Sequence, residues 1–168
     1  LYQGALNKGR GLEWVINAMP LIDNAVLYII GDGDLKKQLE AQVKQLNISE
    51  KVIFHGKVAA SELHRFTPSA HLGLCLLDRQ GMSYYYALPN RIFDYIQAGV
   101  PVLATPFPEI RRIVETYHTG ILTDDYTPEG LATTITSILK EGFPTEHFKQ
   151  LAAQLCWEKE EEKLLLLA

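Results

Sequence analysis

Cysteine is scarce in this sequence of 168 residues, which contains only Cys75 and Cys156. The two lie far apart and form no Cys-x-x-Cys pair, so the sequence offers neither a disulfide framework nor a thiol-rich metal or redox site. A chain of this length buries about 70% of the surface that it would expose when unfolded, and it needs no disulfide to be stable. We therefore expect both cysteines to be reduced thiols in the core of a cytoplasmic protein.

Long apolar runs and an excess of basic residues are also missing. The longest apolar run, LLLLA at the end of the chain, is much shorter than the roughly 20 residues that cross a bilayer, and no signal peptide opens the sequence. The formal net charge of −4 gives no electrostatic reason to expect nucleic acid as a partner. A globular domain that binds neither membrane nor nucleic acid is the expectation that remains.

Several catalytic motifs are absent as well. The sequence contains no HExxH, no clustered Cys and His ligands and no G-x-S-x-G, so we expect neither a metal enzyme nor a hydrolase. The glycines of segment 4–13 fit neither the dinucleotide fingerprint G-x-G-x-x-G nor the P-loop, which requires Gly-Lys-Ser/Thr after its second glycine. No metal ligand and no cofactor is predicted.

Apolar segments alternate with amphipathic ones along the whole chain. Unbroken apolar runs predict six strands, at residues 1–5, 25–31, 51–56, 71–77, 100–105 and 120–123. Helix-like periodicity predicts helices at residues 12–22, 34–48, 61–70, 89–98, 108–117, 127–141 and 146–167. Asp34, Ser61 and Thr127 are expected N-caps. Strands separated by helices pair in parallel through right-handed crossovers, so we predict an α/β fold, a doubly wound parallel sheet of about six strands.

In such sheets a ligand binds at the carboxyl ends of the strands, so the loops after the strands are candidate sites. The first loop, GALNKGRGLE at 4–13, is rich in glycine and carries Lys8 and Arg10 directly before a helix. Glycine lets the backbone approach an anion, and the free N–H groups of a helix start favour negative charge. The loop therefore predicts a phosphate site, and a flexible turn with two solvated cations is the alternative.

The fourth loop leads into ALPNRIFDYIQAGVPV. Pro89 suits the first turn of a helix, and the free N–H groups of Asn90 and Arg91 would face an anion. Asp94 follows one turn later, and a carboxylate there is suited to accept hydrogen bonds from a vicinal diol such as that of a ribose. A solvated acid on an amphipathic helix explains Asp94 alone but not the Pro-Asn-Arg that precedes it.

Two further loops give weaker signals. In GDGDL at 31–35, Gly31 and Gly33 relieve a sharp turn and Asp34 caps the next helix, which favours a structural role. In HGKV at 55–58 the backbone groups could meet a flat ring, whereas His55 itself is expected to be a surface or packing residue.

Taken together, these segments resemble the C-terminal, donor-binding half of the large retaining glycosyltransferase group with the GT-B fold, family 4. The resemblance follows the family's order through GALNKGRGLEWVINAM, LYIIGDGDLKKQL, KVIFHGKV, HLGLCLL, ALPNRIFDYIQAGVPVLATPFPEIRRIV, TGILTDD and PEGLATTI. The most specific part is ALPNRIFDYIQAGVPV, which is similar to the family signature Leu-Pro-Asn-Lys-Leu-Phe-Glu-Tyr followed by a Gly-x-Pro-Val strand. The resemblance implies one nucleotide-sugar-binding domain over residues 1–168, the Rossmann-like half of a GT-B fold.

The resemblance also implies roles for individual residues. Arg10, helped by Lys8, would contact the donor diphosphate and stabilise the charge on the departing phosphate, and Asp94 would bind the ribose hydroxyls. The other donor-binding positions that it implies are Gly4, Gly56, Lys57, Val58, Tyr86, Leu88, Pro89, Asn90 and Arg91. Among these, the backbone of residues 88–90 would hold phosphate and sugar, and residues 56–58 would border the nucleobase.

Three positions depart from the family's pattern. Ala5 stands where an Arg often follows the first glycine, so Lys8 would carry some of that charge. Tyr86 stands at the first signature glutamate, which leaves the usual contact to the donor sugar unassigned. Asp94 shortens the second glutamate. The identity of the sugar therefore does not follow from the resemblance.

The function that the resemblance implies is transfer of a hexosyl group from a nucleoside-diphosphate sugar to an acceptor, with retention and without a metal. Two alternatives stay open: a sugar-nucleotide epimerase of the same architecture and a non-catalytic α/β interaction module. The resemblance also implies an N-terminal acceptor domain of the same full-length protein, which this chain lacks. Peripheral association with a membrane would occur through that domain.

The chain begins with Leu rather than Met, so we expect it to be a piece of a longer one. Its terminal helix, with Trp157 and the leucines at 164–167, would then present an apolar face with less to pack on, and such exposed patches mark interaction sites. Alone, the domain should bind nucleotide weakly and transfer nothing.

Overall fold

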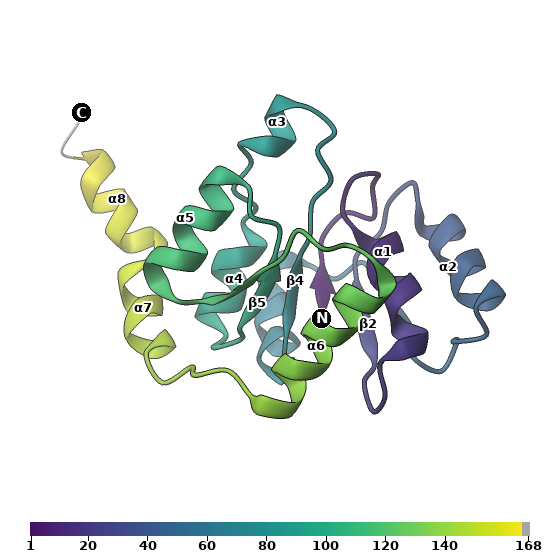
Figure 1. The fold of residues 1–168 in the computed structure, drawn as a ribbon. Helices are drawn as coiled ribbons and strands as arrows, with labels where there is room; N and C mark the ends of the chain where they lie inside the picture. The colour runs from purple at the N-terminus through teal and green to yellow at the C-terminus, as the bar shows by residue number, and fades with distance from the viewer. Residues whose placement is uncertain (166–168) are drawn as a thin grey trace.

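A computed structural model describes residues 1–165 of the chain, with the side chains of residues 1–161. Strands and helices alternate along it (Figure 1). The strands are β1 Tyr2–Gln3, β2 Leu27–Ile30, β3 Val52–Gly56, β4 Gly73–Cys75, β5 Val102–Ala104 and β6 Gly120–Leu122. The α-helices are α1 Leu12–Ala18, α2 Lys36–Gln45, α3 Met82–Tyr85, α4 Arg91–Gln97, α5 Pro108–Tyr117, α6 Pro128–Glu141, α7 Phe148–Gln154 and α8 Trp157–Leu165, and the 3-10 helices are η1 Met19–Leu21, η2 Ala60–Arg65 and η3 Thr67–Ser69.

All strand pairs are parallel, in two three-stranded sheets of order β1-β2-β3 and β4-β5-β6. Two backbone hydrogen bonds join the sheets beside β1: Leu1 N donates to Leu72 O (2.7 Å) and Leu74 N donates to Leu1 O (2.9 Å). The strands thus follow the order 3-2-1-4-5-6 of a doubly wound fold, in which the direction of winding reverses between β1 and β4. The predicted α/β fold with about six parallel strands is confirmed.

Successive side chains of the β4 segment enter different hydrophobic cores, as the period of two along a strand requires. Leu74 and Leu76 belong to a core that includes residues of α1, α2 and α6. Cys75 and Leu77 belong to a second core that includes residues of α4, α5 and α7. Helices therefore cover both faces of the strands, which explains why the strand sequences are unbroken apolar runs.

Tyr95 anchors α4 to β4. Its ring lies directly against Gly73, where an added Cβ would come within 2.5 Å of the ring. The buried Tyr95 hydroxyl donates to Leu1 O (3.3 Å) or Leu74 O (3.4 Å). Because Asp94 precedes Tyr95 in the helix, this contact also sets where Asp94 lies.

The segment 61–70 differs from its prediction. It forms the two 3-10 helices η2 and η3 rather than one α-helix, and Ser61 caps neither, because Ala59 precedes η2 and makes no side-chain cap. Pro68 explains the difference, since proline has no N–H for a helical hydrogen bond and its ring clashes with the preceding turn. The N-cap predicted at Thr127 is confirmed, because its hydroxyl accepts from Gly130 N at 3.1 Å.

The C-terminal segment is divided where one helix was predicted. Helices α7 and α8 are separated at Leu155 and Cys156, and α7 packs on α4, where Gln97 Nε2 donates to the carbonyls of Ala152 (2.9 Å) and Leu155 (3.1 Å). Both cysteines are free, but Cys156 is only half-buried at this break, so the predicted core position is right for Cys75 and wrong for Cys156. Helix α3 was not predicted.

The predicted apolar face of the terminal helix can be judged only in part. Trp157 is 66% exposed. Leu166 and Leu167 lie outside the described residues, and the side chains of Leu164 and Leu165 lie outside the described side chains.

We predict that Gly31→Ala destabilises the fold by roughly 3 kcal/mol or more, because it combines a strained backbone with a backbone clash. Gly31 has φ +149°, and an added Cβ would lie 1.8 Å from Gly4 O. Gly99 is the matched control: it has φ +72° but open space around the Cβ position. Gly99→Ala should cost only about 1–2 kcal/mol. Urea unfolding of both variants measures the difference, and equal losses would contradict the steric explanation.

Candidate functional site

The loops after β1 and β4 meet at the carboxyl edge of the sheet, because these strands are neighbours. Asp78 N donates to Gly9 O (3.0 Å), and Tyr84 Oη donates to Lys8 O (3.2 Å). The loop after β4 carries α3, which rises beyond the carboxyl ends of the strands (Figure 1). The predicted phosphate loop thus forms one wall of a site whose other wall is the segment 76–90.

The loop after β2 braces the first loop. Leu6 N donates to Asp32 O (3.0 Å), Leu35 N donates to Leu6 O (2.9 Å), and an added Cβ on Gly33 would lie 2.7 Å from Leu6 N. The structural role predicted for residues 31–35 is therefore confirmed. The cap predicted at Asp34 is wrong, because α2 begins after Leu35 with no side-chain cap. The Asp32 carboxylate instead accepts from Gly33 N at 2.9 Å.

Arg10 lies half-buried between these loops. Its guanidinium carbon is 5.1 Å from the centre of the Tyr84 ring, a cation–π contact. Its Nε is buried and has no hydrogen-bond partner among the described residues. Lys8 is different, since its side chain is exposed and only its carbonyl takes part in the described loop contacts.

Arg91 brings a second guanidinium to the same edge. It is 8% exposed, and its guanidinium carbon lies 4.5 Å from the centre of the Tyr2 ring. The same carbon lies 3.6 Å from the position that a Cβ on Gly4 would take, so the glycine leaves room beside the cation. Within the described part of the chain Arg91 forms no ion pair, and its Nη1 is buried without a hydrogen-bond partner.

These two unpaired donors are unusual within the protein. Only three buried side-chain N or O atoms in the described residues lack a partner: Arg10 Nε, Arg91 Nη1 and Thr119 Oγ1. A buried N–H without an acceptor is costly, and more so in a charged group. Two of these three unpaired atoms belong to arginines at the carboxyl edge of the sheet. This indicates that the edge is shaped for an anion. The sequence had suggested only the backbone N–H of Arg91, since nothing in it showed that the side chain folds inward.

Asp94 lies at the surface one turn into α4, and Gln3 holds it. Gln3 Nε2 donates to Asp94 Oδ2 (2.8 Å), and Gln3 Oε1 accepts from Thr67 Oγ1 (2.9 Å). Partial burial raises the pKa of Asp94, while the hydrogen bond from Gln3 and the charge of Arg91 act to lower it. Sequence reasoning missed Gln3, although a polar residue within an apolar strand was a signal.

The residues between α3 and α4 border this edge. Helix α4 begins at Arg91, two residues later than predicted, although Ile92 N already donates to Pro89 O (3.1 Å). Asn90 precedes the helix without a side-chain cap, and Leu88 is half-buried like Pro89. Tyr86 is 55% exposed, and among the described residues its ring contacts only the adjacent Tyr85, edge-on at 5.0 Å, so its hydroxyl is available to solvent or ligand.

Gly56 ends β3, and Lys57 and Val58 follow it at the same edge, two strands away from β1. Gly56 has open space where a Cβ would point, and its carbonyl accepts from Gly31 N at 2.8 Å. Lys57 is exposed. His55 is exposed and its ring contacts Tyr28 and Phe66, which agrees with the surface or packing role predicted for it.

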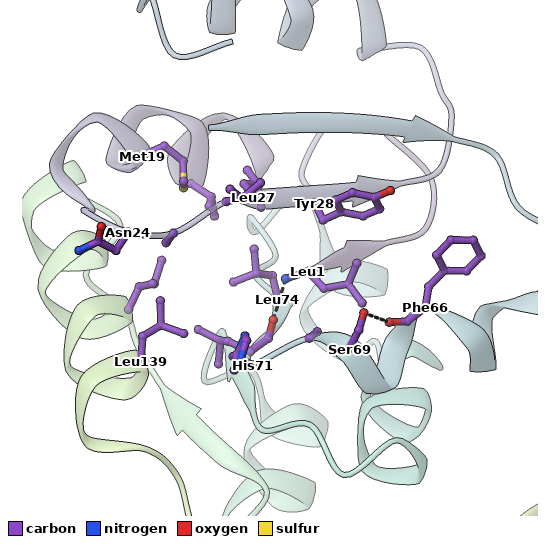
Figure 2. Close-up of a pocket in the computed structure, with 16 residues that line it drawn as sticks. Leu1, Met19, Asn24, Leu27, Tyr28, Phe66, Ser69, His71, Leu74 and Leu139 are labelled. Carbon is purple, nitrogen blue, oxygen red and sulfur yellow. Dashed lines mark hydrogen bonds between the residues drawn. The ribbon is translucent and has the colours of Figure 1, made fainter. Parts of the chain in front are cut away.

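A cavity of about 720 Å³ lies at the opposite, amino edge of the strands. Figure 2 shows Met19 and Leu27 on one side of it and Leu74 and Leu139 on another. The described residues that line it include no Lys, Arg, Asp or Glu. It is therefore poorly suited to a charged ligand, and the candidate site is at the carboxyl edge.

No group of three or more His, Cys, Asp and Glu side chains is placed to hold a metal ion among the described residues, although Asp32 and Asp34 have the spacing of a D-x-D motif. No helix within residues 1–165 is both long and apolar enough to cross a bilayer.

Comparison with known proteins defines the class. Residues 1–141 match the family described as "Glycosyl transferases group 1". The match covers more than half of the chain, and the chain belongs to this family. An uncharacterized glycosyltransferase of Methanocaldococcus jannaschii is 28% identical over 162 residues, 95% of this chain and 40% of the relative. A chitobiosyldiphosphodolichol beta-mannosyltransferase of Debaryomyces hansenii is 34% identical over 99 residues, 58% of this chain and 20% of the relative.

Solved structures share the fold. A sucrose-phosphate synthase from Thermosynechococcus elongatus has a TM-score of 0.84 at 21% identity, over 99% of this chain and 43% of that one. The Anabaena protein HepE, solved with UDP and glucose, has a TM-score of 0.75 at 19% identity, over 91% of this chain and 42% of that one. The chain thus spans less than half the length of these proteins.

We predict that Asp94→Asn increases the stability of the ligand-free protein at neutral pH relative to the wild type. The folded-state pKa of Asp94 lies above its ordinary value of 3.8, so the unfolded chain releases this proton first as pH rises. The wild type therefore loses stability between the unfolded and folded pKa values, and the variant does not. Melting temperatures of both proteins should coincide near pH ~3 and diverge to a constant gap by pH ~7. A gap that is largest in acid would contradict the raised pKa.

Proposed function

We propose that this chain is the nucleotide-sugar-binding domain of a glycosyltransferase that moves a hexosyl group from a nucleoside-diphosphate sugar to an acceptor with retention. One observation carries the proposal: two partly or fully buried guanidinium groups with unpaired donors, Arg10 and Arg91, share an edge of the sheet with the exposed carboxylate of Asp94. Family membership supports the same reading.

The cations fit a diphosphate. Arginine presents its donors in a planar fork that matches phosphate oxygens, and the strength of such bonds increases where water is excluded. Gly4 leaves space beside Arg91, and the glycine-rich loop carries Arg10 and Lys8. In this proposal the diphosphate lies against the guanidinium groups of Arg10 and Arg91, with Lys8 adding charge at the rim.

The carboxylate fits a ribose. A vicinal diol offers two O–H donors, and an ionised carboxylate accepts hydrogen bonds only. Asp94 lies in the first turn of α4, three residues after Arg91, and in this proposal it meets the ribose that is linked to the diphosphate. Gly56, Lys57 and Val58 would then border the base, and Tyr86 with the segment 88–90 would face the sugar.

The chemistry proposed for these residues is electrostatic. When the sugar leaves, negative charge develops on the diphosphate, and cations already in place stabilise that charge without reorganisation. Arg10 is the residue assigned this role, with Lys8 and Arg91 supporting it. The proposal includes no protein nucleophile, metal or other cofactor.

The acceptor would be bound by a separate N-terminal domain of the same full-length protein. The relatives and structural neighbours are more than twice the length that this chain covers, which supports a second domain. One neighbour was solved with UDP and glucose, and several relatives are named as mannosyltransferases, which supports an NDP-hexose as the donor class.

We expect the folded chain to bind one of UDP, GDP and ADP preferentially in calorimetric titration. Arg10→Gln should weaken that binding by about 10- to 100-fold, the range expected for loss of a hydrogen bond from a charged group. The matched control is Arg111→Gln, which removes an exposed arginine whose partner is Glu115 on the same helix. It should leave the affinity unchanged.

Two outcomes would count against the proposal. A folded wild type that binds none of the three nucleotides at millimolar concentration would favour an interaction module. Equal effects of the Arg10 and Arg111 substitutions would mean that the binding site lies elsewhere or that binding depends on net charge alone.

A further inference from the structure

Gln3 occupies a position where an apolar residue would be expected. It ends β1, a strand with neighbours on both sides, and it is 2% exposed. A buried amide that lacks partners destabilises a protein, so such a residue is tolerated only where its polar atoms are bonded. Gln3 satisfies this requirement with two side chains that come from distant parts of the sequence, Asp94 and Thr67.

The charge on Asp94 and the hydroxyl of Thr67 define the orientation of the Gln3 amide. An ionised carboxylate can only accept, so the NH₂ group of Gln3 faces Asp94 Oδ2 and its carbonyl oxygen faces Thr67. Thr67 is itself buried, and its hydroxyl also lies 2.9 Å from Leu63 O in the preceding 3-10 helix. The single hydroxyl proton is shared between these two acceptors, so the helix pair η2 and η3 supports the amide.

The arrangement leaves one carboxylate oxygen of Asp94 available. Oδ2 is bonded to Gln3, whereas Oδ1 has no hydrogen-bond partner among the described residues. Asp94 is exposed, so without Gln3 its short side chain would be free to rotate between solvent-facing rotamers. Tyr95 fixes the helix below it through Gly73, and Gln3 fixes the carboxylate itself.

We infer that Gln3 is a positioning residue for recognition of the ribose: locked by Thr67, it holds the Asp94 carboxylate in an orientation in which Oδ1 receives the ribose diol. This inference rests on the proposed function, because it assigns to Asp94 the ribose contact of a nucleoside diphosphate. It goes further by making the binding of the diol depend on a side chain that does not touch the ligand. The diphosphate contacts of Arg10 and Arg91 do not depend on it.

The test separates the ribose from the phosphates. Three probes are titrated: whichever of UDP, GDP and ADP the wild type binds tightest, its 2′,3′-dideoxy counterpart, and inorganic pyrophosphate. Gln3→Leu keeps the approximate size of the side chain and removes its hydrogen bonds. It should weaken binding of the ribonucleotide about 10-fold and change the other two affinities by less than about twofold.

Two further variants keep the test independent of how well Gln3→Leu folds. Gln3→Glu keeps the shape of the side chain but turns an acceptor toward Asp94. It should therefore weaken binding of the ribonucleotide at neutral pH at least as much as Gln3→Leu does. Thr67→Val leaves Gln3 and Asp94 in place and removes the hydroxyl that bonds the Gln3 amide oxygen and Leu63 O, so it should weaken binding of the ribonucleotide selectively, but by less than Gln3→Leu. Thr134→Val, which removes a hydroxyl bonded to Gly130 O on α6, is the control and should change nothing.

The outcomes distinguish this inference from the proposed function. Wild-type protein that binds the ribonucleotide more tightly than its dideoxy counterpart, with no selective loss in the Gln3 and Thr67 variants, would overturn the inference and leave the proposed function standing. Equal weakening of all three probes would show that Gln3 only supports the fold. Wild-type protein that binds no probe would overturn both.

Discussion

The pairing of β1 with β4 is the interaction on which the rest of this structure depends. Two backbone hydrogen bonds from and to Leu1 join sheets that would otherwise be separate. They place the glycine-rich loop after β1 next to the loop after β4 and next to the start of α4. Without this junction, Arg10 and Arg91, which are separated by about half of the sequence, would have no shared surface. The site therefore follows from strand order rather than from any local motif.

The electrostatics of this edge favour the ligand-bound state of the protein over the ligand-free state. Arg91 is almost fully buried with a ring as its nearest partner, and the pKa of Asp94 is raised because its carboxyl loses water. Both features cost stability in the free protein and would be offset by an anion and by a diol. Proteins commonly accept such losses at binding sites, where stability and activity oppose one another. The large cavity at the amino edge has the opposite character, since its lining carries no Lys, Arg, Asp or Glu among the described residues.

Much of the fold could be predicted from the sequence because its signals are local. Apolar runs covered on both faces predicted the strands, and the ends of α5 and the cap at Thr127 agreed with their predictions. The predictions that were wrong involved competition between neighbours. Pro68 converted a predicted α-helix into 3-10 turns, and the turn around Asp32 and Gly33 removed the need for a cap at Asp34. Cys156 was placed in the core by composition, but it lies at a helix break that periodicity did not reveal.

The sequence by itself determined the class of fold, the family and the edge of the sheet at which to look, because hydrophobic periodicity and the segment ALPNRIFDYIQAGVPV are properties of contiguous residues. Only the tertiary structure decided how the candidate site is built. The structure shows that the Arg91 side chain folds inward and that donors of Arg10 and Arg91 are unpaired. It also shows the hydrogen bonds that link Thr67, Gln3 and Asp94, residues that lie 64 and 91 positions apart in sequence. Such contacts depend on which strands become neighbours, and no local pattern in the sequence encodes that choice.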